Sequence, residues 1–171
     1  MREIVLMRHG KSDWDAPHDR DATRPLSARG REAAVTMGRV LAAVRRVPDV
    51  VLTSPAARAH ATAEMAAAAG GWEAPVLVSD ALYGGGPEDV LDVLRTVPPP
   101  SIRVLVVGHE PAWSETASVL IGGGELRMPT GALAGLEVLV RSWEALAPGT
   151  CRLHWLLPPK LFTDGRLTPP A

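Results

Sequence analysis

Short apolar runs alternate with stretches of helical spacing over residues 3–121, and this alternation limits the chain to few folds. Each apolar run is uninterrupted by charge, as in a strand buried on both faces; the runs are residues 4–7, 50–52, 76–78 and 104–107. The stretches between them carry apolar residues every three or four positions, as amphipathic helices do. The pattern predicts an α/β fold, a three-layer αβα sandwich whose mostly parallel central sheet carries helices on both faces.

Capping residues indicate where the first two helices begin and end. Ser27 has the side chain of a helix N-cap, and helical spacing continues from it to about Arg46. Ser54 is expected to cap the second helix, with Pro55 at its first position. Arg58 should therefore lie in the first turn of that helix, directly after a strand.

The pattern changes after residue 121. Alternate positions become apolar in residues 134–140 and 151–155, which predicts two further strands. At least one should run against the others, giving the sheet an antiparallel edge strand. The chain is expected to form a single domain, residues 1–171, whose proline-rich tail from about residue 158 either packs on the outside or frays.

Composition and charge exclude several classes of protein. A chain of 171 residues that is 46% apolar can bury a full hydrophobic core without disulfide bonds or metal ions to stabilise it. Its single cysteine, Cys151, allows no intrachain disulfide, which favours a reducing, cytoplasmic location. No stretch approaches the ~18 apolar residues of a membrane helix, and no signal peptide is recognisable. A net charge of −1 with interspersed signs argues against nucleic-acid or membrane partners.

Basic and imidazole side chains follow three of the predicted strands. Arg8 and His9 follow the first strand, Arg58 follows the second, and His109 follows the fourth. Because parallel strands share a carboxyl edge, these four side chains should meet at one rim of the sheet. Like charges repel at short range, so such a cluster is expected to hold an anion. Phosphate matches the arginine fork, and the helix that begins at Pro111 adds free N–H groups.

Three blocks of sequence, in order, resemble the histidine phosphatase superfamily. They are Leu-Met-Arg-His-Gly-Lys-Ser at 6–12, Thr-Ser-Pro-Ala-Ala-Arg-Ala-His-Ala-Thr-Ala-Glu at 53–64, and Val-Gly-His-Glu-Pro at 107–111. The short chain, together with Arg-Pro-Leu at 24–26 and Leu-Tyr at 82–83, resembles the small SixA-type phosphohistidine phosphatases. The resemblance implies a phosphoglycerate mutase-like fold.

The same resemblance implies a role for each of four residues. His9 matches the nucleophile that becomes transiently phosphorylated, and Arg8 and Arg58 match the groups that clamp the phosphoryl oxygens. His109 matches the histidine that hydrogen-bonds the transferring group. Water then hydrolyses the phosphoenzyme, with no metal and no cofactor. The implied enzyme is a metal-independent phosphohistidine phosphatase or phosphoric monoester hydrolase.

The chain departs from the superfamily at two positions. Gly84 stands where many relatives have a glutamate that acts as general acid, and Asp13, Asp80 and Glu88 are open candidates to replace it. Loss of the acid favours phosphohistidine, because an imidazole leaves more easily than an alkoxide. Asp15 stands where larger relatives have a phosphate-binding asparagine, and it is expected to point away from the anion.

The segment between the third strand and its helix, residues 79–86, is too short for a lid, so the site should be open. An open site suits a phosphorylated protein as partner, whereas a small phosphorylated metabolite is the other possibility. Lys11 and Ser12 are candidates to contact the anion, and His60 should point elsewhere. Two alternatives to the phosphohistidine phosphatase stay open: a broad-specificity small-molecule phosphomonoesterase, and a catalytically weak phospho-binding module.

Overall fold

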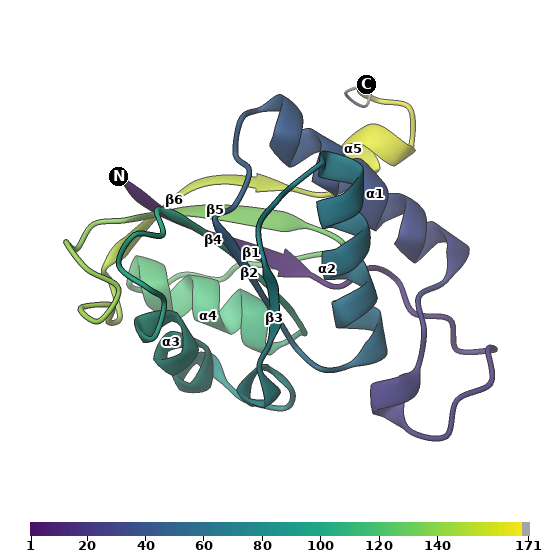
Figure 1. Cartoon of the computed structure of the whole chain (residues 1–171), viewed down its shortest axis with the longest axis horizontal. Helices are drawn as coiled ribbons and strands as arrows, with labels where there is room; N and C mark the ends of the chain where they lie inside the picture. The colour runs from purple at the N-terminus through teal and green to yellow at the C-terminus, as the bar shows by residue number, and fades with distance from the viewer. Residues whose placement is uncertain (169–171) are drawn as a thin grey trace.

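A computed structural model of the chain describes residues 1–168. Its centre is one sheet of six strands in the order β3-β2-β4-β1-β5-β6 (Figure 1). The strands are β1 (Arg2–Arg8), β2 (Val50–Thr53), β3 (Val76–Val78), β4 (Arg103–Gly108), β5 (Leu133–Val138) and β6 (Cys151–Leu157). β1 through β4 pair in parallel, as predicted. β5 runs against β1, and the edge strand β6 pairs antiparallel with β5, which confirms the antiparallel pairing expected at one edge.

Helices cover both faces of this sheet, so the predicted three-layer αβα architecture is confirmed (Figure 1). On one face α1 and α2 pack over apolar residues of β1 such as Val5 and Met7. On the other face α3 and α4 pack over the alternate residues Ile4 and Leu6. The helices are α1 (Ala28–Ala43), α2 (Ala57–Gly70), α3 (Pro87–Arg95), α4 (Ala112–Ile121) and α5 (Lys160–Thr163), with short 3-10 turns at Asp21–Thr23 and Asp80–Leu82.

The connections that leave β1 and β4 go to opposite faces of the sheet. β1 leads into α1 on one face, whereas its neighbour β4 leads into α4 on the other. Two adjacent parallel strands whose chains separate in this way leave a crevice beyond their carboxyl ends. The fold therefore opens a hollow where Arg8, His9 and His109 stand.

The first helix ends earlier than the spacing predicts. α1 stops at Ala43, and Arg45 has a left-handed backbone with φ of 56°, rather than the helix continuing to about Arg46. The N–H of Arg46 donates to the carbonyl of Leu41 at 2.7 Å, which closes the helix end. The Arg46 guanidinium is then 2.9 Å from the buried carboxylate of Glu3 in β1. The two residues are 43 positions apart in the sequence, so helical spacing does not predict this ion pair.

Ser54 does not cap the second helix. α2 begins at Ala57 with Ala56 as its N-cap, because the N–H of Ser54 still donates to the carbonyl of Val107 at 3.1 Å. Ser54 thus continues the sheet, and its hydroxyl accepts from the N–H of Ala56 at 3.3 Å. Arg58 lies in the first turn of α2, as predicted.

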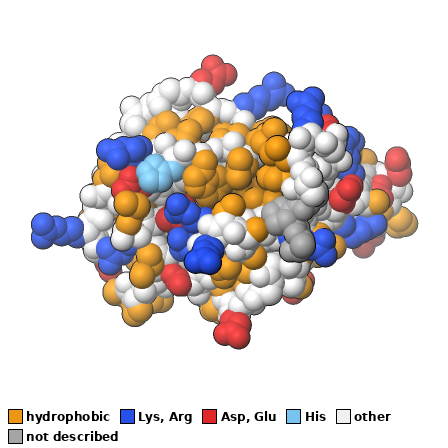
Figure 2. Space-filling view, turned by 90° about the horizontal axis from the view of Figure 1, so that it is seen from above, with side chains coloured by type: hydrophobic (Ala, Val, Ile, Leu, Met, Phe, Trp, Pro, Cys, Tyr) orange, Lys and Arg blue, Asp and Glu red, His pale blue; other side chains and the backbone are white. Residues whose placement is uncertain are grey.

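The outer surface of the α1 and α2 layer is seen in Figure 2, where apolar side chains form a broad area bordered by basic groups. The alanine-rich sequence of α2 contributes short apolar side chains to this layer. Helix α5 packs beside α1, so the described part of the tail lies against this layer through Phe162 (Figure 1). Over residues 1–168, no helix is long and apolar enough to cross a membrane.

Candidate active site

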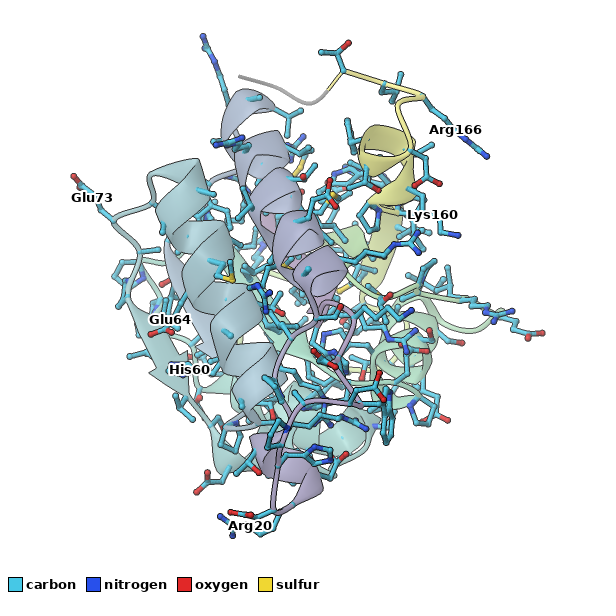
Figure 3. The ribbon with its side chains drawn as sticks, turned by 90° about the vertical axis from the view of Figure 1, so that its right-hand side faces the viewer. Arg20, His60, Glu64, Glu73, Lys160 and Arg166 are labelled. Carbon is cyan, nitrogen blue, oxygen red and sulfur yellow. The ribbon has the colours of Figure 1, made fainter. Side chains whose placement is uncertain are left out.

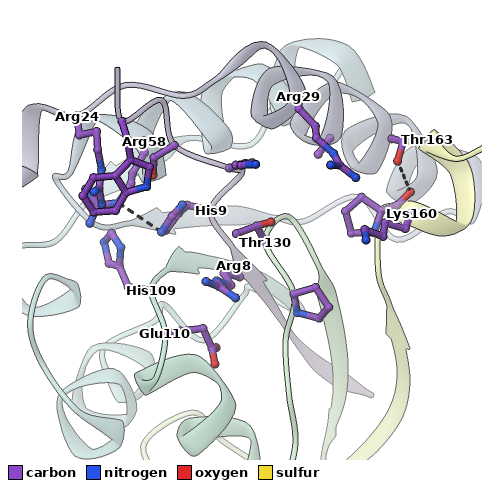
Figure 4. A pocket seen from close by; sticks show the side chains of 16 residues that line it. Arg8, His9, Arg24, Arg29, Arg58, His109, Glu110, Thr130, Lys160 and Thr163 are labelled. Carbon is purple, nitrogen blue, oxygen red and sulfur yellow. Dashed lines mark hydrogen bonds between the residues drawn. The ribbon is translucent and has the colours of Figure 1, made fainter. Parts of the chain in front are cut away.

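The four residues singled out at the strand ends line one cavity of about 540 Å³ (Figure 4). Arg8 ends β1 and His9 follows it, His109 follows β4, and Arg58 is the second residue of α2. Because β2, β4 and β1 are neighbours in the sheet, their carboxyl ends deliver these side chains to the same place. The structure therefore brings together residues that are up to 101 positions apart in the sequence, from Arg8 to His109.

Two contacts establish which nitrogen of His9 carries the proton. Nδ1 lies 2.6 Å from the carbonyl oxygen of Gly10, which can only accept, so Nδ1 is the donor. The Nε of Arg58, which can only donate, lies 3.3 Å from Nε2. Nε2 therefore carries a lone pair, and this nitrogen faces Arg58.

Burial keeps this imidazole neutral. The His9 side chain is buried, and removal from water is the largest cause that lowers its pKa from 6.5 to about 3. The hydrogen bond to Gly10 opposes this effect, but nearby His109, Arg58 and Arg8 lower the pKa further. At neutral pH, His9 is an uncharged base whose Nε2 lone pair accepts only the long 3.3 Å contact from Arg58 among the described residues.

His109 stands beside His9, with 5.0 Å between the two ring centroids. Its Nε2 is 2.8 Å from the hydroxyl of Ser54, which also accepts from the N–H of Ala56 at the start of α2. Its Nδ1 is buried, and no residue of the described chain hydrogen-bonds it. Burial, followed by the charge of Arg58, lowers the pKa of His109 to about 4.

Arg58 is held from behind by a carboxylate that the sequence did not indicate. Its NH2 is 2.9 Å from Oδ2 of Asp21, and its NH1 donates to the Asp21 carbonyl at 2.7 Å. The same Oδ2 accepts from the Tyr83 hydroxyl at 2.9 Å. Partial burial opposes ionisation of Asp21, but the hydrogen bonds from Arg58 and Tyr83 outweigh it and lower the pKa of its carboxyl group.

Arg8 and Arg24 complete the set of guanidinium groups at the cavity. Arg8 donates from NH1 to the carbonyl of Met128 at 2.8 Å, while its Nε is buried without a partner among the described residues. Arg24 reaches the cavity from the loop before α1 and pairs with Asp21 at 2.9 Å. No spacing rule links a loop residue to a helix arginine 37 positions later, so sequence reasoning missed Asp21 and gave Arg24 no role.

The cavity wall is strongly cationic. Its lining holds six basic side chains and a single carboxylate, that of Glu110, whose oxygens accept from the N–H and hydroxyl of Ser114. The basic residues are Arg8, Lys11, Arg24, Arg29, Arg58 and Lys160. The chain as a whole has a formal net charge of −1, so positive charge is concentrated here. Within residues 1–168, no three His, Cys, Asp or Glu side chains are grouped as metal ligands would be.

None of the carboxylates considered as a replacement acid lines this cavity. Asp13 accepts from the N–H groups of its own loop, Asp80 is exposed, and Glu88 pairs with Arg95 at 2.7 Å. Gly84 lines a smaller hollow of about 270 Å³ that His109 also borders, and a Cβ at position 84 would have open space around it.

The remaining candidates divide between the cavity and the outer surface. Lys11 and Ser12 line the cavity, whereas Asp15 is exposed and lies outside its lining, as expected. His60 lies on the outer side of α2, 3.6 Å from Glu64 (Figure 3). Helix α5 contributes to the cavity wall through Lys160 and Thr163, so the described part of the tail takes part in shaping this site, rather than being merely peripheral as expected from the sequence.

The sequence signature of the "Histidine phosphatase superfamily (branch 1)" matches residues 4–83. Among solved structures, the SixA protein of Nakamurella multipartitia shares 31% sequence identity over 91% of this chain and 95% of that one, with a TM-score of 0.79. The chain belongs to the histidine phosphatase superfamily.

Two further proteins are similar to this chain over most of its length. The protein histidine phosphatase SixA, solved in complex with tungstate, has a TM-score of 0.77 at 26% identity, over 92% of this chain and 97% of that one. An uncharacterized protein of Mycobacterium tuberculosis is 37% identical over 86% of this chain and 96% of its own length. The expected phosphoglycerate mutase-like fold and SixA-type resemblance are confirmed, and together they support a phosphatase activity.

Proposed function

We propose that this chain is a phosphohistidine phosphatase that forms a covalent intermediate on His9. The observation that carries the proposal is the lone pair on Nε2 of a neutral, buried imidazole in a cationic cavity. A nucleophile for phosphorus must be unprotonated, and the group that it receives is anionic. His9 meets the first requirement, and the arginines around it meet the second.

In the first step, Nε2 of His9 attacks phosphorus and the P–N bond of the substrate breaks. The electron pair of that bond goes to the leaving ring nitrogen. A substrate imidazole that is protonated on its other nitrogen leaves as neutral imidazole, so this step needs no proton from the chain. Arg8 and Arg58 neutralise the phosphoryl oxygens, and His109 hydrogen-bonds the transferring group.

In the second step, water attacks the phosphorus bound to His9 and the P–Nε2 bond breaks. The electron pair returns to Nε2, and both protons of the water remain with the inorganic phosphate that is released. The imidazole regains the neutral form with its proton on Nδ1, held by the Gly10 carbonyl. The cycle then begins again.

The carboxylates near the cavity are poor proton donors, which favours phosphohistidine over phosphate esters as the substrate. An alkoxide leaving group needs a proton donor, and relatives supply it from the position where this chain has Gly84. Asp21 is a poor donor because its pKa is lowered, and both oxygens of Glu110 accept hydrogen bonds from Ser114. An imidazole leaving group removes the need for such a donor.

An accessible cavity supports a phosphorylated protein as the substrate. The segment between β3 and α3 spans only residues 79–86 and holds a single 3-10 turn, Asp80–Leu82. A phosphorylated side chain on a folded protein can reach such a site only where no lid covers the cavity. The proposed steps draw their positive charge from arginine, so we expect EDTA to leave turnover unchanged.

A substrate panel tests this proposal. We expect kcat/KM at neutral pH to be higher for a phosphohistidine peptide than for alkyl phosphate monoesters such as sugar phosphates. Higher activity on the esters would contradict the proposal and favour a broad-specificity phosphomonoesterase. Binding of both without turnover would favour a phospho-binding module. His60→Gln, on the outer side of α2, is the control variant.

A further inference from the structure

Arg24 is a buried cation that neither the strand-end pattern nor the proposed steps use. Its side chain is only 7% exposed, yet it belongs to the cavity lining. The guanidinium carbon lies 3.4 Å from the centroid of the Trp14 ring, and NH2 is 2.9 Å from Oδ1 of Asp21. Stacking on one face and one ion pair at one end hold the group in a defined orientation.

Most of the hydrogen-bonding capacity of Arg24 is unused. Its Nε and NH1 are both buried, and neither has a partner among the described residues. A guanidinium cannot lose its proton in a protein, and a buried donor without an acceptor destabilises the fold. Arg24 is therefore a donor pair that lacks an acceptor, in the wall of a cavity that we propose receives an oxyanion.

Asp21 ties Arg24 to the group that contacts His9. Its Oδ1 is 2.9 Å from Arg24 and its Oδ2 is 2.9 Å from Arg58, so one carboxylate joins two guanidiniums. The Asp21 side chain is 51% exposed, whereas both arginines are buried. The carboxylate thus stands on the solvent side and the arginines on the inner side, where Figure 4 shows them beside His9.

A purely structural role explains Arg24 less well. An arginine that only clamps a loop satisfies its donors with backbone carbonyls, as Arg31 does with Leu26 at 2.7 Å and Arg95 does with Leu146 at 2.9 Å. Arg24 makes no such contact in residues 1–168, and its only polar partner is Asp21. Its charge also reaches His109, whose pKa it helps to lower.

We propose that Arg24 is a third guanidinium ligand of the phosphoryl group, alongside Arg8 and Arg58. Its Nε–H and NH1 groups donate to a phosphoryl oxygen on the side of His109, and Asp21 and Trp14 hold it in place. The inference rests on the proposed function, because it requires that the cavity bind phosphate.

Binding of inorganic phosphate tests this role directly. Titration calorimetry on the full chain should show that Arg24→Gln weakens phosphate binding at least tenfold, since charge-assisted hydrogen bonds to an anion are lost. Arg20→Gln is the matched control, because Arg20 lies in the same loop and is exposed (Figure 3). We expect the control to bind within twofold of the wild type.

Thermal unfolding separates anion binding from a structural role. Phosphate should raise the Tm of the wild type and of Arg20→Gln, and should raise that of Arg24→Gln much less. Should Arg24→Gln fail to fold, Arg24→Lys keeps a charge but loses the planar fork, and we expect at least fivefold weaker binding. Wild-type affinity in the folded Arg24 variant would overturn the inference and leave the proposed function standing. No phosphate binding by the wild type would overturn both.

Discussion

At the scale of single residues, the candidate site depends on which atoms each side chain leaves free. The Gly10 carbonyl takes the proton of His9 Nδ1, so the lone pair is on Nε2. Asp21 takes NH1 and NH2 of Arg58, so Nε is the atom that faces His9. Both side chains are oriented before any substrate arrives, which is how a site lowers the cost of ordering during reaction.

Replacing Arg58 tests its proposed role as a clamp. Arg58→Ala removes a guanidinium from the phosphoryl oxygens, and we expect kcat/KM for a phosphohistidine peptide to fall by about 10²–10³-fold. Steady-state kinetics on the folded variant gives this number. A loss of less than tenfold would contradict the role.

Sequence reasoning located the main residues of this site but not their partners. His9, Arg58 and His109 could be predicted because each follows a strand, and strand ends share an edge. Asp21 and Tyr83 could not be, since they approach from irregular segments whose path depends on tertiary packing. Ser54 had the sequence of a helix cap, but its contact with His109 depends on where the sheet hydrogen bonds end.

At the scale of elements, one threonine couples the segment after β1 to helix α2. Thr62 is fully buried; its hydroxyl donates to the carbonyl of Arg58 at 2.7 Å and accepts from the N–H of Gly10 at 3.0 Å. A Cβ at Gly10 would lie 2.5 Å from the carbonyl oxygen of Gly30 in α1, so no larger residue fits there. β1, α1 and α2 are thereby held in register around His9.

Removing this hydroxyl should affect both stability and turnover. Thr62→Val leaves the Gly10 N–H without an acceptor in a buried place, so we expect the free energy of unfolding to fall by ~1–3 kcal/mol. Displacement of His9 should also lower kcat. Urea unfolding and steady-state kinetics check the two effects.

Thr116 offers a matched control for that substitution. It is also fully buried, but its hydroxyl has no partner among the described residues. Thr116→Val should therefore be neutral or stabilising, because it removes an unsatisfied polar group of the same shape. Equal losses of stability in the two variants would show that the Thr62 hydrogen bonds are not what matters.

At the scale of the whole molecule, the fold places the site at the carboxyl end of β1, and ion pairs to a buried carboxylate hold the amino end of the same strand. Glu3, near the amino end of β1, is buried and contacts Arg46 and Arg103 at 2.9 and 2.5 Å. Two apolar cores, one on each face, cover the strands between that ion-pair cluster and the cavity. This rigid support lets the fold bury two neutral histidines beside several cations.

Burial of these histidines makes the folded state sensitive to acid. The pKa of His9 is lowered to about 3 and that of His109 to about 4, whereas an unfolded chain titrates near ~6.5. Between pH 6.5 and 4 the unfolded chain binds more protons than the folded chain, so stability is present above 6.5 and is lost as pH falls.

Urea unfolding at pH 7 and pH 5 measures this loss. His9→Gln removes one of the two groups, so we expect its free energy of unfolding to fall less over that range than the wild-type value does. An identical fall in both proteins would mean that His9 is protonated in the folded state near its ordinary pKa.

The central claim is that His9 receives the phosphoryl group, and trapping the phosphoenzyme tests it most directly. Rapid quenching after mixing with a phosphohistidine peptide, followed by mass spectrometry of proteolytic fragments, should place an acid-labile, base-stable phosphate on His9. The label should be present in wild type and in His60→Gln, and absent in His9→Gln. Turnover with no phosphate on His9, or a label that persists in His9→Gln, would contradict the account.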